Sequence, residues 1–338
     1  MNNLKFFLSI VCSTLLMSCY AQIPADSTAD KMLVYQLSNG GWPKQLEDKS
    51  VVNYDLALTP ELKEKIKATT DLHATFDNKA TSREVVYLLK AYKKTRNKNY
   101  LKAAEKGLDF ILEAQYDNGG WPQYYPDRAS YRSQITYNDD AMINVLNILQ
   151  DIATQTNDFE NVNAAYIEKA KNAVNKGISC ILKTQVKQKA KPAIWAAQYD
   201  KDSMLPAKAR AFEPASLSTS ESVSIIRFLM RFKNPSDEIK NSITGAVKWF
   251  TEYKITGYRF DREKTGSGLI ADNTSVVWAR FYDLEKNIPI FGDRDNTVKL
   301  KLEELSPERR NGYAWYGNWG QKLIEKDYPK WLASNAIK

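Results

Sequence analysis

The sequence predicts an all-α protein, an (α/α)3 toroid of helical hairpins with a few short strands. Apolar residues recur at helical spacing through most of the chain. The helical segments pair into three hairpins, at roughly 80–115, 139–185 and 220–254. The second helices of the first two hairpins also resemble each other, as "KGLDFILEAQ" (106–115) and "KGISCILKTQ" (176–185). Repeated helical hairpins usually stack side by side and bury a shared core, which gives a toroid when the stack curves.

Residues 1–21 are predicted to be a secretory signal peptide, which leaves 22–338 as a single toroid domain. The segment has one Lys, an apolar run from Phe6 to Met17 and small residues after it. This run is too short for a membrane-spanning helix. A bacterial lipoprotein signal ending at Cys19 is the alternative interpretation. In either case we expect a secreted or periplasmic protein.

Composition narrows the possible chemistry. His73 is the only histidine in the sequence, which excludes a Ser-His-Asp triad and a multi-histidine metal site. The formal charge of +8 indicates an acidic partner. Because no nucleic-acid-binding motif is present, a polyanionic carbohydrate is favoured over nucleic acid. The alternative is that the charge only aids solubility. No protein partner is indicated, and we expect a monomer.

The loops "SNGGWPKQ" and "DNGGWPQYYP" repeat, each with a Gln six positions before its Trp, at Gln36–Trp42 and Gln115–Trp121. This pattern resembles the Gln-Trp repeat of α/α-toroid proteins, including terpene cyclases, which implies that the Gln caps a neighbouring helix end. The two glycines form the turn, and the proline prevents the helix from continuing. We therefore interpret the motif as structural. In a third copy, between Gln185 and Trp195, "KQKAKPAI" replaces the Gly-Gly turn.

Short strands are expected near 191–199 and 256–260.

Polar residues are concentrated in the segments just before the first helix of each hairpin. In a ring of hairpins these three segments lie on one face. They contain Asp77 and Asn78 before the first hairpin, Asn138, Asp139 and Asp140 before the second, and Arg210, Glu213, Ser220 and Glu221 before the third. Helix capping explains one acid per segment, but not Asn-Asp-Asp, nor an arginine near the positive end of a helix dipole. Carboxylates converging from separate hairpins indicate a Ca²⁺ site completed by water and an acidic substrate.

The C-terminal third combines arginines with aromatic residues, in "WARFYD" (Arg280), "FGDRDN" (Arg294) and "SPERRNGYAWYGNWG" (Arg309 and Arg310). Planar guanidinium groups bind carboxylates in bidentate fashion. Aromatic faces can stack on sugar rings. The composition fits an acidic polysaccharide, and surface arginines beside core aromatics are the alternative.

Together, the motifs "NGGWP", "DNKAT", "YNDDAM", "RAFEPASLSTSES", "WARFYD", "GDRD" and "RRNGYAWYG" resemble those of the pectate lyases of polysaccharide lyase family 10. The similarity extends over nearly the whole chain after the signal segment. It implies an (α/α)3 toroid that cleaves polygalacturonate, the backbone of pectin, by calcium-dependent β-elimination. A base removes the C5 proton of the galacturonate in the +1 subsite, and the C4–O bond then breaks.

The resemblance also implies roles for individual residues. They are calcium binding for Asp77 and Asp139, proton abstraction for Arg210, and substrate binding for Asn78, Arg280, Arg294 and Arg309, with Arg310 as the alternative to Arg309. An arginine base conflicts with the ordinary guanidinium pKa above about 12. We expect neighbouring cations to lower the pKa of Arg210, and activity to rise above neutral pH.

Other functions remain possible from the sequence. A toroidal glycoside hydrolase could use Asp139 with Glu213 or Asp77 as its two acids, and a non-catalytic protein could only bind pectin. A terpene-cyclase-like protein is disfavoured because its acid-rich patterns are missing. Lys79 in "DNKAT" and the third-copy loop depart from the resemblance. Endo or exo action and tolerance of methyl esters are left open.

Overall fold

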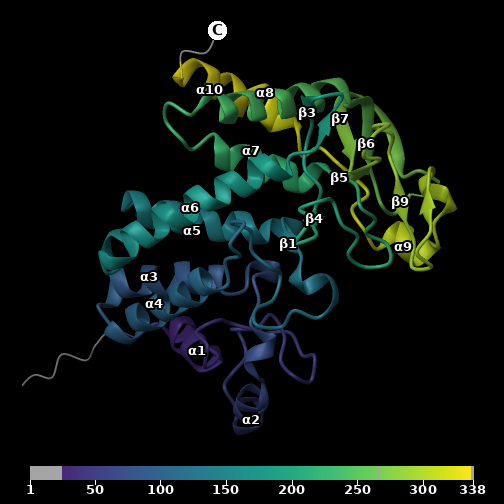
Figure 1. Cartoon of the computed structure of the whole chain (residues 1–338). Helices are drawn as coiled ribbons and strands as arrows, with labels where there is room; N and C mark the ends of the chain where they lie inside the picture. Colours follow the sequence, from purple (N-terminus) through teal and green to yellow (C-terminus); the bar gives the residue numbers. More distant parts are fainter. Residues whose placement is uncertain (1–24, 265, 336–338) are drawn as a thin grey trace, which may run out of the picture.

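The computed structural model describes residues 25–264 and 266–335, so the predicted signal peptide and Cys19 lie outside the described residues. Within them, three antiparallel helical hairpins stack in chain order (Figure 1). The first helices are α3 (Ser82–Thr95), α5 (Ala141–Thr154) and α7 (Thr219–Leu229), and the second helices are α4 (Lys98–Glu113), α6 (Ala165–Thr184) and α8 (Asp237–Glu252). First helices contact first helices and second helices contact second helices, which gives two layers. The (α/α)3 toroid is therefore confirmed.

Shorter helices extend this stack. Helix α1 (Ser27–Tyr35) precedes the first repeat, and its Asp26 cap accepts a hydrogen bond from the backbone N–H of Ala29. The remaining helices and turns are α2 (Pro60–Ala68), α9 (Pro307–Asn311), α10 (Tyr328–Ser334), η1 (Asp71–His73), η2 (Asp77–Lys79), η3 (Ser130–Ser133), η4 (Asn138–Asp140), η5 (Phe159–Asn161), η6 (Leu302–Glu304) and η7 (Leu323–Asp327). None of the helices in the described part of the chain is long and apolar enough to cross a membrane.

The strands are mostly two-residue antiparallel pairs at one end of the helices (Figure 1). They are β1 (Ile135–Thr136) with β4 (Gln198–Tyr199), β2 (Lys187–Gln188) with β3 (Lys191–Pro192), β5 (Leu217–Ser218) with β8 (Phe281–Tyr282), and β9 (Phe291–Gly292) with β10 (Val298–Lys299). A three-stranded sheet has the order β11-β7-β6, with β11 (Tyr316–Gly317), β7 (Leu269–Ala279) and β6 (Ile255–Phe260).

The strands expected near 191–199 and 256–260 are confirmed as β3, β4 and β6. The longest strand, β7, was not predicted. Its sequence "LIADNTSVVWA" does not alternate, because only its last three residues are buried. Pairing with β6 at 269–271 and 276–277, on either side of a bulge, rather than burial of one face, makes this segment a strand.

The Gln-Trp repeat is structural, as predicted. Trp121 is fully buried, and its indole N–H donates to the carbonyl of Ile111 at 2.8 Å. The Gln115 amide donates to the carbonyl of Gly119 in its own turn and to that of Ala173 in the next hairpin. Equivalent bonds join Trp42 to Met32 and Gln36 to Gly40 and Ala103, and Trp195 to Ile181 and Gln185 to Ala193 and Ser242.

The carbonyl on the neighbouring helix that accepts the glutamine hydrogen bond does not lie where we expected. Ala173 lies inside α6 rather than at its end, so the expectation of a helix-end cap was wrong. The repeat places the glutamine beside the middle of the next second helix, because the tight turn brings the loop against that helix. The third copy keeps the same bonds although its turn is the β2–β3 hairpin.

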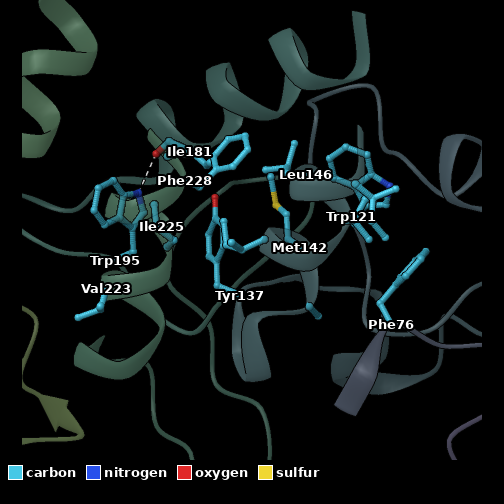
Figure 2. Packing of buried hydrophobic residues seen from close by; sticks show 14 of the residues in the cluster. Phe76, Trp121, Tyr137, Met142, Leu146, Ile181, Trp195, Val223, Ile225 and Phe228 are labelled. Atoms are coloured by element: carbon cyan, nitrogen blue, oxygen red, sulfur yellow. Dashed lines mark hydrogen bonds between the residues drawn. The ribbon is translucent and has the colours of Figure 1, made fainter. Parts of the chain in front are cut away.

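The hydrophobic core connects successive repeats. Figure 2 shows Met142 and Leu146 of α5 between Trp121 of one repeat and Trp195 of the next, with Tyr137 beside them. All five side chains are fully buried. Burial of a large apolar side chain stabilises a fold by roughly 1.5–3 kcal/mol. The core therefore fixes the helix ends from which the polar loops emerge.

Gly119 tests how closely the Gln-Trp turn approaches the next hairpin. Its φ is +91°, and a Cβ would lie 2.1 Å from the carbonyl oxygen of Lys176. We expect Gly119→Ala to lower the free energy of unfolding by roughly 3 kcal/mol or more, from left-handed strain and backbone displacement together. Urea denaturation measures this loss of unfolding free energy. Gly257→Ala is the matched control, with φ +82° and nothing within 4 Å, and it should cost about 1 kcal/mol. Equal losses would contradict this account.

Candidate active site

Two short turns place the predicted acids next to each other. The turns η2 and η4 precede α3 and α5 and contact one another. In each turn the middle residue is left-handed, Asn78 at φ 50° and Asp139 at φ 52°, a conformation that Asn and Asp tolerate better than most residues. Asp140 occupies the N-cap of α5 but makes no capping hydrogen bond. Helix capping therefore does not account for these acids.

Backbone hydrogen bonds hold the segments before the first helices. Each segment donates to the chain of a later repeat, which the short strand pairs reinforce. The bonds are Phe76 N to Gln123 O, Tyr137 N to Ala197 O, and Thr219 N to Arg280 O, at 2.8–3.0 Å. The polar side chains consequently come from a rigid framework, which reduces the reorganisation needed on binding.

Asp77 is buried, and one of its oxygens, Oδ2, accepts a hydrogen bond from the Lys44 ammonium. The other, Oδ1, is buried with no partner in the described part of the chain. Burial lowers the pKa of Lys44, but the charge and hydrogen bond of Asp77 outweigh it, so that pKa is raised. The neighbouring Asn78 is exposed. Lys44 was missed because it follows "GGWP", a motif interpreted as structural.

Asp139 connects the three pre-helix segments electrostatically. Asp139 is an exposed residue. Partial burial of its carboxyl group nevertheless raises its pKa, and repulsion from Asp77 and Glu221 adds to this effect. Arg280 and Arg210 oppose the rise. Acids of the first two hairpins and the arginine before the third therefore surround one site. Their geometry agrees with the face predicted from the repeat.

Asp140 has a pKa raised to about 6, because burial and the negative charges of Glu221 and Asp139 outweigh a hydrogen bond to Ser224. The sequence placed it in the Asn-Asp-Asp cluster without a role. Its position beside Asp139 means that two carboxyl groups of this cluster, not one, prefer a nearby cation or a proton.

Glu221 and Arg280 form a buried ion pair across the site. Their side chains are 2% and 13% exposed, and the second Glu221 oxygen accepts a hydrogen bond from the Ser218 hydroxyl. Burial lowers the pKa of Arg280, but Glu221, Tyr313, Asp139 and Glu213 together outweigh it, so that pKa is raised. The Nε of Arg280 is buried without a partner among the described residues. Arg280 therefore keeps a hydrogen-bond donor while its position is fixed.

Arg210 is held by Glu213. Its Nε donates to Oε2 at 2.8 Å, and its Nη2 donates to the other carboxylate oxygen. The hydrogen bond to Glu213 raises the pKa of Arg210, although burial opposes it. The expectation that neighbouring cations lower this pKa was therefore wrong for this structure. The reason is local, since the carboxylate three residues along the chain lies at hydrogen-bond distance from the guanidinium.

The remaining arginines meet at the ring of Phe212, a residue that the sequence did not single out. The guanidinium of Arg309 lies 4.1 Å from the ring centroid, that of Arg210 4.8 Å and that of Arg294 5.4 Å. Such contacts are attractive because the ring face is electron-rich.

The surroundings of these arginines differ. Arg309 is buried with its Nε unpartnered in the described part of the chain. Arg294 is exposed and pairs with Glu308 at 2.7 and 2.9 Å. Arg310 bonds only weakly to Asn311. Of the two adjacent arginines, the structure therefore brings Arg309 to this cluster.

Asp77 and Asp139 could hold a divalent cation. The free Oδ1 of Asp77 and the repulsion between the two carboxylates both fit a positive ion between them. Within residues 25–264 and 266–335, no group of three or more His, Cys, Asp or Glu side chains forms a metal-binding cluster. An ion here would need water and substrate oxygens to complete its coordination, as hard cations accept readily.

Comparisons with known proteins identify the family of the chain. No curated protein matches the sequence. The chain is similar to a solved family 10 polysaccharide lyase from Cellvibrio cellulosa, with a TM-score of 0.82 and 33% identity over 92% of both chains. It is also similar to an aspartate-to-alanine mutant of such a lyase from the same organism, in complex with trigalacturonic acid, with a TM-score of 0.82 and 34% identity over 90% of this chain and 92% of the other. The model of the family described as pectic acid lyase matches residues 36–324. The chain therefore belongs to the pectic acid lyase family, and the protein is a pectate lyase.

Proposed function

We propose that the protein is an exported enzyme that cleaves polygalacturonate by calcium-dependent β-elimination, with Arg210 as the base. The observation that carries this proposal is the meeting of Asp77, Asp139 and Arg210, which come from three different repeats. Export rests on the sequence pattern of the segment 1–21. The trigalacturonic acid bound to the similar Cellvibrio lyase supports the substrate class.

The arginines would bind the carboxylates of the polymer. Arg280 and Arg309 are buried guanidinium groups whose Nε has no partner among the described residues, and the positive charge of each group would attract a substrate carboxylate. The exposed Arg294 would contact a further galacturonate from the rim, and Asn78 would offer its amide beside Asp77. The rigid segments before α3, α5 and α7 would thus orient the polygalacturonate carboxylates across the N-terminal ends of these helices.

Asp77 and Asp139 would hold Ca²⁺ together with the substrate. When bound, the ion would neutralise the carboxylate attached to C5 as negative charge develops there, and so make the C5 proton easier to remove. Within the chain, Lys44 would keep one oxygen of Asp77 engaged while leaving Oδ1 free. Arg280 would add a second positive charge to the same carboxylate.

Arg210 would take the C5 proton. The electrons of the C5–H bond form the C4–C5 double bond, and the C4–O bond breaks with its electron pair on the departing oxygen, which is then protonated by solvent. Arg210 can act only when its guanidine is neutral. Because Glu213 raises the pKa of Arg210, the neutral fraction is small near neutral pH. Activity should therefore rise as the medium becomes alkaline.

Ultraviolet absorbance of polygalacturonate digests tests this function. The lyase product has a double bond conjugated with a carboxylate, so we expect absorbance to rise with Ca²⁺ and to stop rising after a chelator is added. New reducing ends without absorbance would instead identify a hydrolase. Binding without either product would identify a protein that only recognises pectin. A rate that is unaffected by the chelator would overturn the calcium assignment.

Glu213→Gln tests whether Glu213 sets the pKa of Arg210. Glutamine keeps the size but removes the charge that raises the pKa of Arg210. A lower pKa gives more neutral guanidine at a given pH, so the alkaline rise in kcat/KM should move to lower pH. Glu308→Gln is the control, because it removes the carboxylate paired with Arg294 instead and should not move the rise. A loss of rate that is equal at all pH values, with the alkaline rise at the same pH, would show that Glu213 only positions Arg210.

A further inference from the structure

A hollow separate from the active-site residues opens beside the third Gln-Trp repeat. It has a volume of about 860 Å³ and is formed by the β2–β3 hairpin, the end of α8 and the turn 284–287. None of the residues assigned above to catalysis or substrate binding lines it. We call it the lysine hollow, after its lining residues Lys187, Lys189, Lys191, Lys248 and Lys286.

The charge of the lysine hollow is not neutralised by the protein. All five lysines are exposed, and none forms an ion pair within residues 25–264 and 266–335. Two carboxylates, Glu252 and Glu285, also line the hollow, so positive charge predominates. Like charges gathered around a concave surface repel one another, and an anion that enters the hollow relieves this repulsion.

A hydrogen-bond network fixes the floor of the hollow. The side-chain amides of Gln188 and Asn287 bond reciprocally at 2.9 and 3.0 Å. The indole of Trp249 donates to the Asn287 oxygen at 2.7 Å, and the Asn287 amide donates to the Tyr253 hydroxyl at 3.1 Å. Because these bonds tie the hairpin, α8 and the 284–287 turn together, the lysines project from a fixed backbone.

The toroid itself does not need this hairpin. In the first two repeats a Gly-Gly turn suffices, and in the third Gln185 and Trp195 keep the same buried bonds around the longer "KQKAKP" segment. The insertion of lysines here is therefore not explained by the structural role of the repeat. It adds positive charge at a place that the fold leaves open.

The lysine hollow lies within reach of a polymer bound in the active site. Lys286 follows Arg280 by six residues, through β8, so their Cα atoms are at most about 20 Å apart. On the basis of the proposed function, we propose that the lysine hollow binds a second stretch of the same de-esterified polygalacturonate chain. It would hold the enzyme on the polymer while the active site cleaves elsewhere along it.

The triple variant Lys187→Ala, Lys189→Ala and Lys191→Ala tests this proposal. At low ionic strength we expect KM for polygalacturonate to rise roughly tenfold, with kcat unchanged. Both constants for trigalacturonate should stay within about twofold, because a short chain cannot occupy both places. An unchanged KM for the polymer would overturn the proposal. So would an equal change for the trimer, which would mean that the hairpin only supports the active site.

The matched control removes the same charge elsewhere. Lys94, Lys98 and Lys102 are exposed, form no ion pair among the described residues, and lie on α3 and α4. Their triple alanine variant should change the polymer KM by less than about twofold. An effect as large as that of the hairpin variant would show that only total charge matters, and would refute a specific site.

Binding separates this proposal from the lyase assignment. Polygalacturonate binding is measured by calorimetry in an Arg210→Ala background, with and without the hairpin substitutions, so the result does not depend on turnover. We expect the hairpin substitutions to weaken binding of polygalacturonate roughly tenfold and of polyglutamate by much less. Equal weakening for both polymers would mean that the hollow recognises charge alone, and would reject the sugar polymer as its ligand.

Discussion

Replacing Arg210 with alanine is expected to lower kcat on polygalacturonate by roughly 10²–10⁴-fold, the usual contribution of a general base. Binding of trigalacturonate should remain measurable, because Arg280, Arg294 and Arg309 are unchanged. Initial rates of absorbance increase and calorimetric binding provide the two measurements. Retention of more than about a tenth of the wild-type kcat would remove Arg210 from the role of base.

Two further variants separate chemistry from folding. Arg210→Ala leaves the largely buried Glu213 carboxylate unpaired, so Arg210→Ala with Glu213→Gln, which carries no such charge, should be equally inactive but more stable. Arg210→Lys should recover part of the rate, with a rise at lower pH, since the ordinary pKa of lysine is about 10.4. Arg231→Ala, which removes a guanidinium paired with Asp151, is the control and should leave kcat unchanged.

The helical framework could be predicted because its signal is local. Apolar spacing and the Gln-Trp repeat placed the second hairpin at 139–185, and the structure has α5 and α6 over 141–184. The strand β7 could not be predicted in this way. Only its last three residues are buried, and hydrogen-bond pairing with β6 on either side of a bulge makes it a strand, so the sequence lacks the alternation that burial of one face imposes.

The site residues were predictable where they follow the repeat. Asp77 and Asp139 occupy equivalent turns before successive first helices, and this equivalence is visible in the sequence. Lys44 was not predictable, because its contact with Asp77 joins loops 33 residues apart. Phe212 was overlooked because an aromatic residue beside an arginine has no distinctive spacing, and only the fold brings Arg294 and Arg309 to the same ring.

The pairing of Arg210 with Glu213 shows a different kind of error. Both residues were noted in the sequence, and their separation of three positions already allows contact. The direction of the pKa shift was nevertheless expected from more distant cations. A carboxylate at hydrogen-bond distance dominates such a balance, because it adds a direct hydrogen bond to the charge interaction.

Replacing Arg280 with methionine is expected to lower the free energy of unfolding by roughly 3–5 kcal/mol, the cost of leaving one member of a buried ion pair alone. Glu221, only 2% exposed at its side chain, would keep the Ser218 hydroxyl but lose its positive partner. Thermal and urea unfolding measure the loss. Activity should also fall, because the guanidinium proposed to bind the uronate is removed.

The double variant Arg280→Met with Glu221→Gln separates these two effects. Without a buried charge it should recover most of the lost stability, since an apolar or neutral replacement of a buried pair is often tolerated. Its activity should stay as low as that of Arg280→Met, because the guanidinium is still missing. Arg294→Met is the control, since it breaks an exposed pair with Glu308 and should raise KM without a measurable change in stability. If Arg280→Met were as stable as Arg294→Met, the Glu221–Arg280 pair would have no part in stability, and its role would be confined to binding the uronate.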